Sequence, residues 1–389
     1  MSTRVSPEAL LARLKSVLPQ DGHPLALHEP RFVGNEWKYV KDCIDTGWVS
    51  TVGEYVTRFE QQLAAYTGAA HAIAVVNGTA ALHVCLLLAG VQPNDEVIIP
   101  SLTFIATANA VSYCGAIALL ADSEEGSLGM DAEKLARFLS ANAELRDGAC
   151  FNKLTGRRIA ALMPMHTFGH PVAVDELVHL ADQWHIPLVE DAAESLGSFY
   201  KGRHTGNFGK IAGLSFNGNK VITTGGGGAI LTNSHELAKR AKHLTTTARL
   251  PHKWSFIHDK VGYNYRLPNI NAALGCAQLE CLPDFLARKR VLGQRYMAAL
   301  EDLPGVRFVA EPVGTQSNYW LNTLLLDASD EMHRDGVLEA LNQAGLGARP
   351  AWTLMHQLPM FAQVPRMDLS VAEDLARRIV NIPSSVALG

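Results

Sequence analysis

HAIAVVNGTAALHVCLLLAG, residues 71–90, sets the pattern on which the fold of this chain is built. Residues 71–77 form a short apolar run with two valines and an isoleucine, which predicts a buried strand, and residues 78–90 predict a helix. Asn-Gly-Thr lies at the junction, where backbone N–H groups at the start of the helix have no partner within the helix. The stretch therefore predicts one strand–helix unit.

Outward from this unit, short apolar strands and helical stretches alternate through the first two-thirds of the chain. This alternation is typical of an α/β fold with a largely parallel sheet covered by helices on both faces. Further strands are predicted at residues 96–100, 117–121, 159–165 and 187–191, and helices at residues 103–113 and 175–184.

Past about residue 250 the pattern changes. A helix predicted at residues 283–300 precedes shorter strands such as residues 319–326, which indicates a smaller α+β unit. We therefore expect a large α/β domain with an N-terminal helical segment over residues 1–250, and a small C-terminal α+β domain over residues 251–389. Residues 249–265 are expected to form a long ordered loop, and loops of this length tend to be functional or intersubunit.

Charge and composition exclude several classes of protein. The 389 residues include 34 Lys and Arg against 38 Asp and Glu, so neither nucleic acid nor a membrane surface is an expected partner. The six cysteines form no CxxC pair, the histidines form no HExxH, and no metal site is expected. Neither a signal peptide nor an apolar run long enough to span a membrane is found, which predicts a cytoplasmic protein.

A lysine set among small residues carries the first chemical argument. Lys220 closes the motif SFNGNK (residues 215–220) and lies shortly before four consecutive glycines at residues 225–228. An amine with no acidic neighbour in sequence suits a lysine that forms an imine. Upstream, the predicted strand 187–191 ends in Asp191, a carboxylate that needs a partner when buried. A Schiff-base lysine and an acidic partner for a pyridinium nitrogen predict a pyridoxal phosphate enzyme.

Four more residues are candidates for holding this cofactor. Thr79 begins the helix after the first strand, where a phosphate is a natural ligand, although threonine is also a common helix cap. Phe104 follows a strand end and would cover the pyridine ring or pack in the core. Glu194 would reach the ring's phenolic edge or the substrate, or serve as a helix N-terminal acid. Ser215, at the start of the lysine motif, would hold a phosphate oxygen.

Five motifs occur in order along the chain: NGTAAL (77–82), TFIAT (103–107), EDAAE (190–194), SFNGNK (215–220) and GYNYR (262–266). Together they resemble the DegT/DnrJ/EryC1/StrS family of pyridoxal phosphate-dependent nucleotide-sugar aminotransferases. The resemblance extends from about residue 27 to residue 385. It implies the fold-type I, or aspartate aminotransferase-like, architecture.

Three segments look most like the LegC branch of this family. They are residues 27–36, the SFNGNK motif and the closing NIPSS at residues 381–385. That branch acts on a UDP-linked 4-keto-6-deoxy-N-acetylhexosamine in the bacterial synthesis of legionaminic acid and related surface-glycan amino sugars.

The resemblance also implies residue roles at the reacting end of the cofactor. Lys220 would carry the cofactor and shuttle the proton, Asp191 would pair with the pyridine nitrogen, and Phe104 would stack on the ring. Glu194 departs from the His or Gln of many members, and a carboxylate beside the phenolic oxygen needs a hydrogen-bond donor or a raised pKa.

At the phosphate end, the resemblance implies contacts from two subunits. Thr79 and Ala80, through backbone N–H groups, and Ser215 would hold the phosphate. Asn264 would reach the phosphate of the neighbouring subunit's cofactor, which implies a homodimer with shared active sites.

Contacts with the substrate are the least specific expectation. His166 follows a predicted strand and would face the same sheet edge as the cofactor. Ser50 lies in WVST (residues 48–51), which resembles the family segment beside the sugar nucleotide. His356 and Trp352 are further candidates for contact with the sugar or the base.

The resulting prediction is a two-stage transamination. The amino group of L-glutamate would pass to C4 of a nucleotide-linked 4-keto-6-deoxy sugar, the UDP-linked N-acetylhexosamine first, with pyridoxamine phosphate as the amine-bearing form of the cofactor. The alternative substrate is GDP-4-keto-6-deoxymannose, as in perosamine synthesis. A further alternative is a regulator with this fold and no turnover. An NAD-dependent sugar epimerase or dehydratase would need an early glycine fingerprint, which the sequence lacks.

Overall fold

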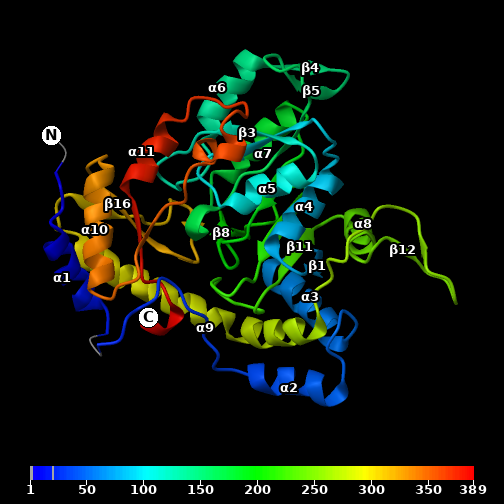
Figure 1. The fold of residues 1–389 in the computed structure, drawn as a ribbon, viewed down its shortest axis with the longest axis horizontal. Helices are drawn as coiled ribbons and strands as arrows, with labels where there is room; N and C mark the ends of the chain where they lie inside the picture. Colours follow the sequence, from blue (N-terminus) through cyan, green and yellow to red (C-terminus); the bar gives the residue numbers. More distant parts are fainter. Residues whose placement is uncertain (1–2, 20–21) are drawn as a thin grey trace.

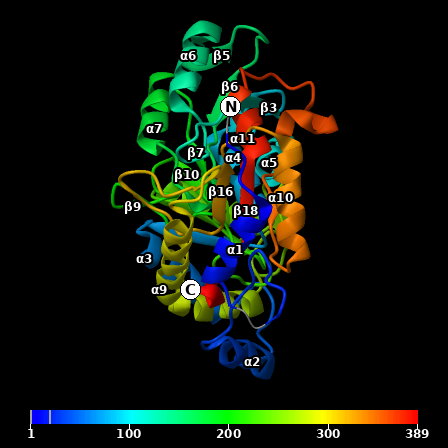
Figure 2. The ribbon, with the colours of Figure 1, turned by 90° about the vertical axis from the view of Figure 1, so that its left-hand side faces the viewer.

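The large sheet is made of two groups of hydrogen-bonded strands that two isolated bridges join. The computed structural model describes residues 3–19 and 22–389 (Figures 1 and 2). Parallel bridges from Leu162 to Leu188 and from Met165 to Asp191 connect the groups. The strand orders are β1 (His71–Val75), β11 (Gly228–Thr232), β10 (Ile211–Ser215), β7 (Val189–Asp191), and β3 (Ile117–Ala121), β2 (Glu96–Pro100), β6 (Ile159–Leu162).

Most strand pairs in this sheet are parallel, as predicted. β10 pairs with β7, and β2 pairs with both β3 and β6, all in parallel register, whereas β11 runs antiparallel to both of its neighbours. Along β11, Ala229 and Leu231 join one hydrophobic cluster and Ile230 joins another. This alternation follows from the two-residue period of a strand, so side chains on both faces of the sheet are buried. Burial on both faces requires helices on both sides of the sheet.

Helices on the two faces of the sheet come from different parts of the chain. One cluster includes residues of α3 and α9, and the other includes residues of α4, α5 and α8. Helices α6 and α7 share a further cluster. The bounds of all these helices are α3 (Glu54–Thr67), α4 (Gly78–Ala89), α5 (Ile105–Tyr113), α6 (Ala132–Asn142), α7 (Val174–Gln183), α8 (His235–Thr245) and α9 (Asn269–Leu300).

The C-terminal part forms a smaller antiparallel sheet with helices on it. Its strand order is β14 (Val306–Phe308), β16 (Asn322–Leu326), β18 (Ile379–Ile382), β17 (Arg349–Pro350), with α10 (Glu331–Gln343) and α11 (Ser370–Arg378) beside it. The division of the chain at residue 250 stays a prediction.

The first helix packs on elements from the C-terminal part of the chain. The sequence assigned the N-terminal helical segment to the large domain, but α1 (Pro7–Val17) packs against the C-terminal unit. Leu10 and Leu14 of α1 are fully buried in one cluster with Leu292 and Tyr296 of α9. Their spacing of four residues places both leucines on one face of the helix, and that face covers the C-terminal sheet.

Helix α9 is longer than predicted and runs beneath both units (Figure 1). The sequence placed its start at Pro283, whereas the structure begins it at Asn269 with Pro283 inside. A proline inside a helix costs about 3 kcal/mol. Buried Ala272, Ala273 and Cys276 pack upstream of it, and this packing holds the helix together. Helix α2 (Glu36–Thr46) lies along the same helix.

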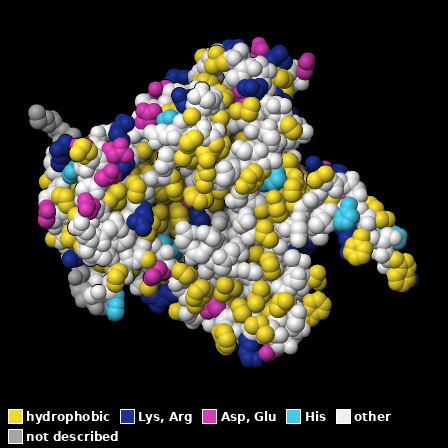
Figure 3. All heavy atoms as spheres, viewed as in Figure 1, with side chains coloured by type: hydrophobic (Ala, Val, Ile, Leu, Met, Phe, Trp, Pro, Cys, Tyr) yellow, Lys and Arg dark blue, Asp and Glu magenta, His cyan; other side chains and the backbone are white. Residues whose placement is uncertain are grey.

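Residues 249–265, expected as a long loop, form a projecting arm (Figure 1). Two short strands, β12 (Arg249–Leu250) and β13 (Ile257–His258), pair within it. Trp254 and Phe256 are 78% and 75% exposed, and Figure 3 shows hydrophobic and histidine side chains at its end.

Short elements complete the described part of the chain. They are β4 (Ala143–Arg146), β5 (Ala149–Asn152), β8 (Phe199–Tyr200), β9 (Arg203–His204), β15 (Thr315–Gln316), and the 3-10 turns η1 (Thr167–Gly169), η2 (Met355–Gln357), η3 (Pro359–Phe361) and η4 (Val386–Leu388). Across residues 3–19 and 22–389, none of the helices combines the length and the apolar character needed to cross a membrane.

Candidate active site

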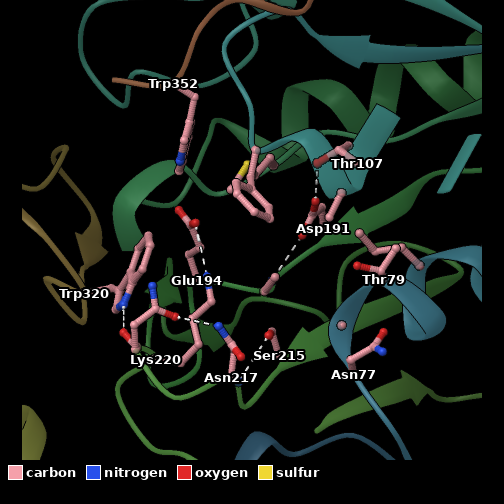
Figure 4. Close-up of a pocket in the computed structure, with 17 residues that line it drawn as sticks. Asn77, Thr79, Thr107, Asp191, Glu194, Ser215, Asn217, Lys220, Trp320 and Trp352 are labelled. Atoms are coloured by element: carbon pink, nitrogen blue, oxygen red, sulfur yellow. Dashed lines mark hydrogen bonds and ion pairs between the residues drawn. The ribbon is translucent and has the colours of Figure 1, made fainter. Parts of the chain in front are cut away.

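A cavity of about 360 Å³ lies at the carboxyl ends of β7 and β10, where α4 and α5 begin (Figure 4). This is the edge at which open α/β sheets bind ligands. The cavity brings together Lys220, Asp191 and the N-terminus of α4, which the sequence marked separately. Its lining residues are Asn77, Gly78, Thr79, Leu82, Phe104, Ala106, Thr107, Met165, Asp191, Ala193, Glu194, Ser215, Asn217, Asn219, Lys220, Trp320 and Trp352.

Asp191 is a buried carboxylate at the end of β7. The Thr107 hydroxyl donates to its Oδ2 at 2.7 Å, and the Ala193 N–H donates to its Oδ1 at 3.2 Å. Burial raises the pKa of Asp191, and the hydrogen bond from Thr107 opposes that rise. Among the described residues, no cationic side chain lies within 4 Å of this carboxylate. A ligand that brings a positive charge to this position would therefore satisfy it.

Lys220 forms an ion pair with Glu194 inside the cavity. Its Nζ lies 3.2 Å from Glu194 Oε1 and 3.9 Å from the centre of the Trp320 ring. Burial raises the pKa of Glu194 to about 7, and the positive charge of Lys220 opposes that rise. The other carboxylate oxygen accepts the Phe168 N–H at 2.9 Å. Phe168 takes a left-handed backbone with φ 54°, an uncommon conformation for this residue type, to present that N–H.

The start of α4 forms the cradle expected for a phosphate. Thr79 and Ser215 both line it. A Cβ added at Gly78 would lie 2.8 Å from Ser215 Cβ, so only glycine leaves the space between α4 and the end of β10 open. The Ala80 N–H, predicted as a phosphate ligand, already donates to Asn77 Oδ1 at 2.8 Å. A phosphate would have to compete with the Asn77 cap for this group.

Aromatic side chains form the wall opposite Asp191 and Thr79 (Figure 4). Phe104, 46% exposed, lies with its ring centre 6.1 Å from that of Trp352. Trp320 was missed by the sequence interpretation, which placed it in a strand over residues 319–326. The strand begins at Asn322, and the Trp320 indole N–H donates to the Asn219 carbonyl at 2.6 Å. Trp320 thereby holds the loop that carries Lys220.

His166 does not line the cavity within this chain, and the substrate or cofactor contact expected of it stays a prediction. Its side chain is fully buried, with Nε2 3.2 Å from Glu190 Oε2 and Nδ1 accepting the Val172 N–H at 3.3 Å. Its backbone N–H donates to the Asp191 carbonyl. Both ring nitrogens are therefore engaged within the protein, and His166 supports the position of Asp191.

Ser50 and His356 also lie outside the lining of this cavity. The His356 ring bridges Ser101 Oγ at 2.9 Å and Glu373 Oε1 at 3.2 Å. Ser50 is exposed, and its carbonyl accepts the Asn269 N–H at 2.6 Å. Neither residue reaches the cavity within this chain, so their contacts with substrate stay predictions.

Asn264, predicted to act across a subunit interface, is exposed and lies outside the cavity lining. It forms a bridge with Thr246, near the base of the arm. Its position leaves the side chain accessible to another molecule.

Comparisons with known proteins agree with this site. The DegT/DnrJ/EryC1/StrS aminotransferase family profile matches residues 31–389. The chain is 38% identical over 370 residues to a GDP-perosamine synthase from Caulobacter vibrioides, covering 94% of each chain. It is 34% identical over 361 residues to a GDP-perosamine synthase from Vibrio cholerae, covering 92% of this chain and 94% of the other. A crystal structure of a DegT DnrJ EryC1 StrS aminotransferase from Brucella abortus matches with a TM-score of 0.82 at 27% identity, covering 91% of each chain. The expected fold-type I architecture is thereby confirmed.

Proposed function

We propose, since the chain belongs to the DegT/DnrJ/EryC1/StrS aminotransferase family, that it transfers an amino group from L-glutamate to C4 of a GDP-linked 4-keto-6-deoxy sugar. The chain is a pyridoxal phosphate-dependent sugar aminotransferase. The sugar and its nucleotide are the part of the proposal that depends on the relatives. Two GDP-perosamine synthases, matched over more than nine-tenths of this chain, support the GDP-linked substrate over the UDP-linked N-acetylhexosamine of the LegC branch.

The side chains in the cavity fit pyridoxal phosphate. Asp191 offers a buried carboxylate without a cationic partner within 4 Å among the described residues, which suits a protonated pyridine nitrogen. Gly78 and Ser215 leave open a space at a helix N-terminus, which suits a phosphate. Lys220 adds a primary amine to the lining of the same cavity. When bound, pyridoxal phosphate supplies an electron sink for the substrate's reacting carbon.

The side chains that line the cavity have different roles in this proposal. Lys220 Nζ takes and returns the proton at the reacting carbon, and general acid–base transfer of this kind contributes roughly 10² to 10⁴ in rate. Asp191 keeps the ring nitrogen protonated. Glu194, next to the amine, accepts or supplies a proton near neutral pH because burial raises its pKa to about 7. Phe104 and Trp352 keep water from the reacting atoms.

The observation that carries this proposal is the meeting of Lys220 and Asp191 in one cavity. The test is the absorbance of the pyridoxal phosphate-saturated protein. L-Glutamate should abolish the visible band, and GDP-4-keto-6-deoxymannose should restore it with release of an amino sugar. Restoration by the UDP-linked N-acetylhexosamine alone would reverse the substrate assignment.

Lys220→Ala is the matched control for that experiment. It should bind the cofactor without the visible band and show no response to glutamate. Turnover by this variant above a trace, without an added amine, would contradict the assignment of Lys220.

The same proposal includes a homodimer with shared active sites. Its support is that Asn264 is exposed outside its own chain's cavity and lies near an arm with exposed Trp254 and Phe256. Lys220→Ala and Asn264→Ala should each be inactive alone. A mixture after subunit exchange should regain activity, because one site of a mixed dimer has both native residues. A mixture that stays inactive while forming dimers would refute the shared site.

A further inference from the structure

A second cavity, of about 350 Å³, adjoins the first. Asn219, Trp320 and Trp352 line both, so the two aromatic rings stand between them. None of the described residues that line this second cavity is an Asp or a Glu, whereas Arg349 and His28 are part of its wall. A cavity with a cation and no acid on its wall is suited to a negatively charged ligand.

Arg349 supplies the formal positive charge of this wall. It lies on the short strand β17 and is exposed. Its Nη1 donates to the Ala348 carbonyl at 3.2 Å, and within residues 3–19 and 22–389 no carboxylate lies within ion-pair distance of its guanidinium. A guanidinium without an acidic partner can bind a planar carboxylate through two parallel hydrogen bonds.

His28 is the second polar group of the wall. The residue is 9% exposed, and neither ring nitrogen has a hydrogen-bond partner among the residues that the structure describes. Buried polar groups without a partner are uncommon in proteins and call for an explanation. Burial, followed by the charges of Lys289 and Lys220, holds the pKa of His28 well below its usual range, so the ring is neutral.

Buried Lys289, in its protonated form, adds to the positive potential behind this wall. Its side chain is fully buried, and Nζ donates to the Trp320 carbonyl at 3.1 Å and to the Ser384 carbonyl at 2.6 Å. No acidic side chain within 4 Å balances it among the described residues. Of the two acids in the first cavity wall, Asp191 and Glu194, Glu194 is already paired with Lys220.

We propose that this second cavity binds a carboxylate of the dicarboxylic amino donor, the end that does not react. The inference rests on the proposed function and adds to it the location of the donor. With its amine on the Lys220 side of Trp320 and Trp352, a dicarboxylate places its free carboxylate toward Arg349. The diphosphate of a sugar nucleotide is the other anion that a cationic wall would attract, so the test includes both.

The experiment measures ligand binding to the pyridoxal phosphate-saturated protein by calorimetry. Glutarate serves as an unreactive dicarboxylate, butyrate as its monocarboxylate control, and GDP as the diphosphate probe. Arg349→Gln should weaken glutarate binding roughly tenfold or more, because hydrogen bonds to charged groups contribute this much to affinity. Butyrate and GDP should bind both proteins equally.

Arg366→Gln is the matched control. Arg366 is also exposed, and its Nη1 also donates to one backbone carbonyl, that of Ala362 at 3.3 Å, but it lines neither cavity. Its glutarate affinity should equal that of the native protein, and Arg349→Lys should keep part of the lost affinity. Equal glutarate binding in native and Arg349→Gln proteins would overturn the inference, and so would a loss confined to GDP.

The glutamate half-reaction separates failure of this inference from failure of the proposed function. If the native protein converts its cofactor with glutamate and Arg349→Gln does so at the same half-saturating concentration, the donor site is elsewhere and the proposed function stands. If the native protein responds to no amino donor, the proposed function fails with it.

Discussion

Lys220 Nζ lies 3.2 Å from Glu194 Oε1, so the amine that would carry the cofactor rests on a buried carboxylate. The carboxylate is held from its other side by the N–H of Phe168, a residue with a left-handed backbone. Because burial raises the pKa of Glu194 to about 7, the Glu194 carboxylate gains or loses its proton near neutral pH. The net charge of the pair therefore changes with the protonation of Glu194.

Glu194→Gln should change how stability depends on pH in the cofactor-free protein. The folded pKa of Glu194, about 7, is above its ordinary value of 4.5, so the folded state binds more protons than the unfolded state between these values. The native protein should therefore lose stability relative to Glu194→Gln as pH rises from about 4.5 to about 7. Urea unfolding across this range measures it. Glu133→Gln, on an exposed surface, should follow the native curve, and parallel curves for all three would refute the prediction.

Thr107→Val should weaken cofactor binding. The change removes the donor 2.7 Å from Asp191 Oδ2 and leaves a buried carboxylate oxygen without it. A hydrogen bond to a charged group contributes about 1.5–3 kcal/mol, which corresponds to roughly 10- to 150-fold in the pyridoxal phosphate dissociation constant. Thr107→Ser keeps the hydroxyl and should bind nearly as well as the native protein. Equal dissociation constants for the Val and Ser variants would show that the hydroxyl has no such role.

Gly78→Ala should close the phosphate cradle. The added Cβ would lie 2.8 Å from Ser215 Cβ and 3.1 Å from Ser215 Oγ, so the end of β10 would have to move. We expect a loss of at least roughly tenfold in pyridoxal phosphate affinity, measured by tryptophan fluorescence of the cofactor-free protein. Gly226→Ala is the control, because, apart from its chain neighbours, no atom of residues 3–19 or 22–389 lies within 4 Å of its added Cβ. A similar effect in both variants would point to general destabilisation.

Lys289→Met should remove a dependence of stability on pH that is opposite in sign to the one caused by Glu194. Burial lowers the pKa of Lys289 to about 7, below its ordinary value of 10.5. Between these values the unfolded state binds more protons, so the native protein should gain stability as pH rises from about 7 to about 10.5. The difference in unfolding free energy between native and Lys289→Met proteins should grow along this range in favour of the native protein. A constant difference would mean that Lys289 keeps its ordinary pKa.

The sheet could be predicted where strands are buried on both faces. β2 and β3 occupy the predicted residues 96–100 and 117–121, because their apolar runs are bounded by polar or small residues. Helix α9 was predicted too short, because Pro283 ends a helix by local rules and the packing that overrides them is visible only in three dimensions.

The site could be predicted only as far as residue type implies chemistry. Lys220 and Asp191 lie in one cavity, and their roles stay predictions. The contact between Lys220 and Glu194 depends on how two loops meet, and no spacing in the sequence encodes it. Trp320 had one available signal, an aromatic residue two positions before the start of a strand. His166 follows a strand end as expected, but its side chain bonds Glu190 outside the cavity lining, because a strand end does not determine which way a side chain points.

The position of α1 has a practical consequence for shortened versions of this protein. The family match begins at residue 31, which invites a truncation at that point. The shortened chain would lack Leu10 and Leu14, whose burial covers apolar surface of the C-terminal unit around Leu292 and Tyr296. The truncation would expose this apolar surface to solvent, and the shortened protein would aggregate more readily than the full chain.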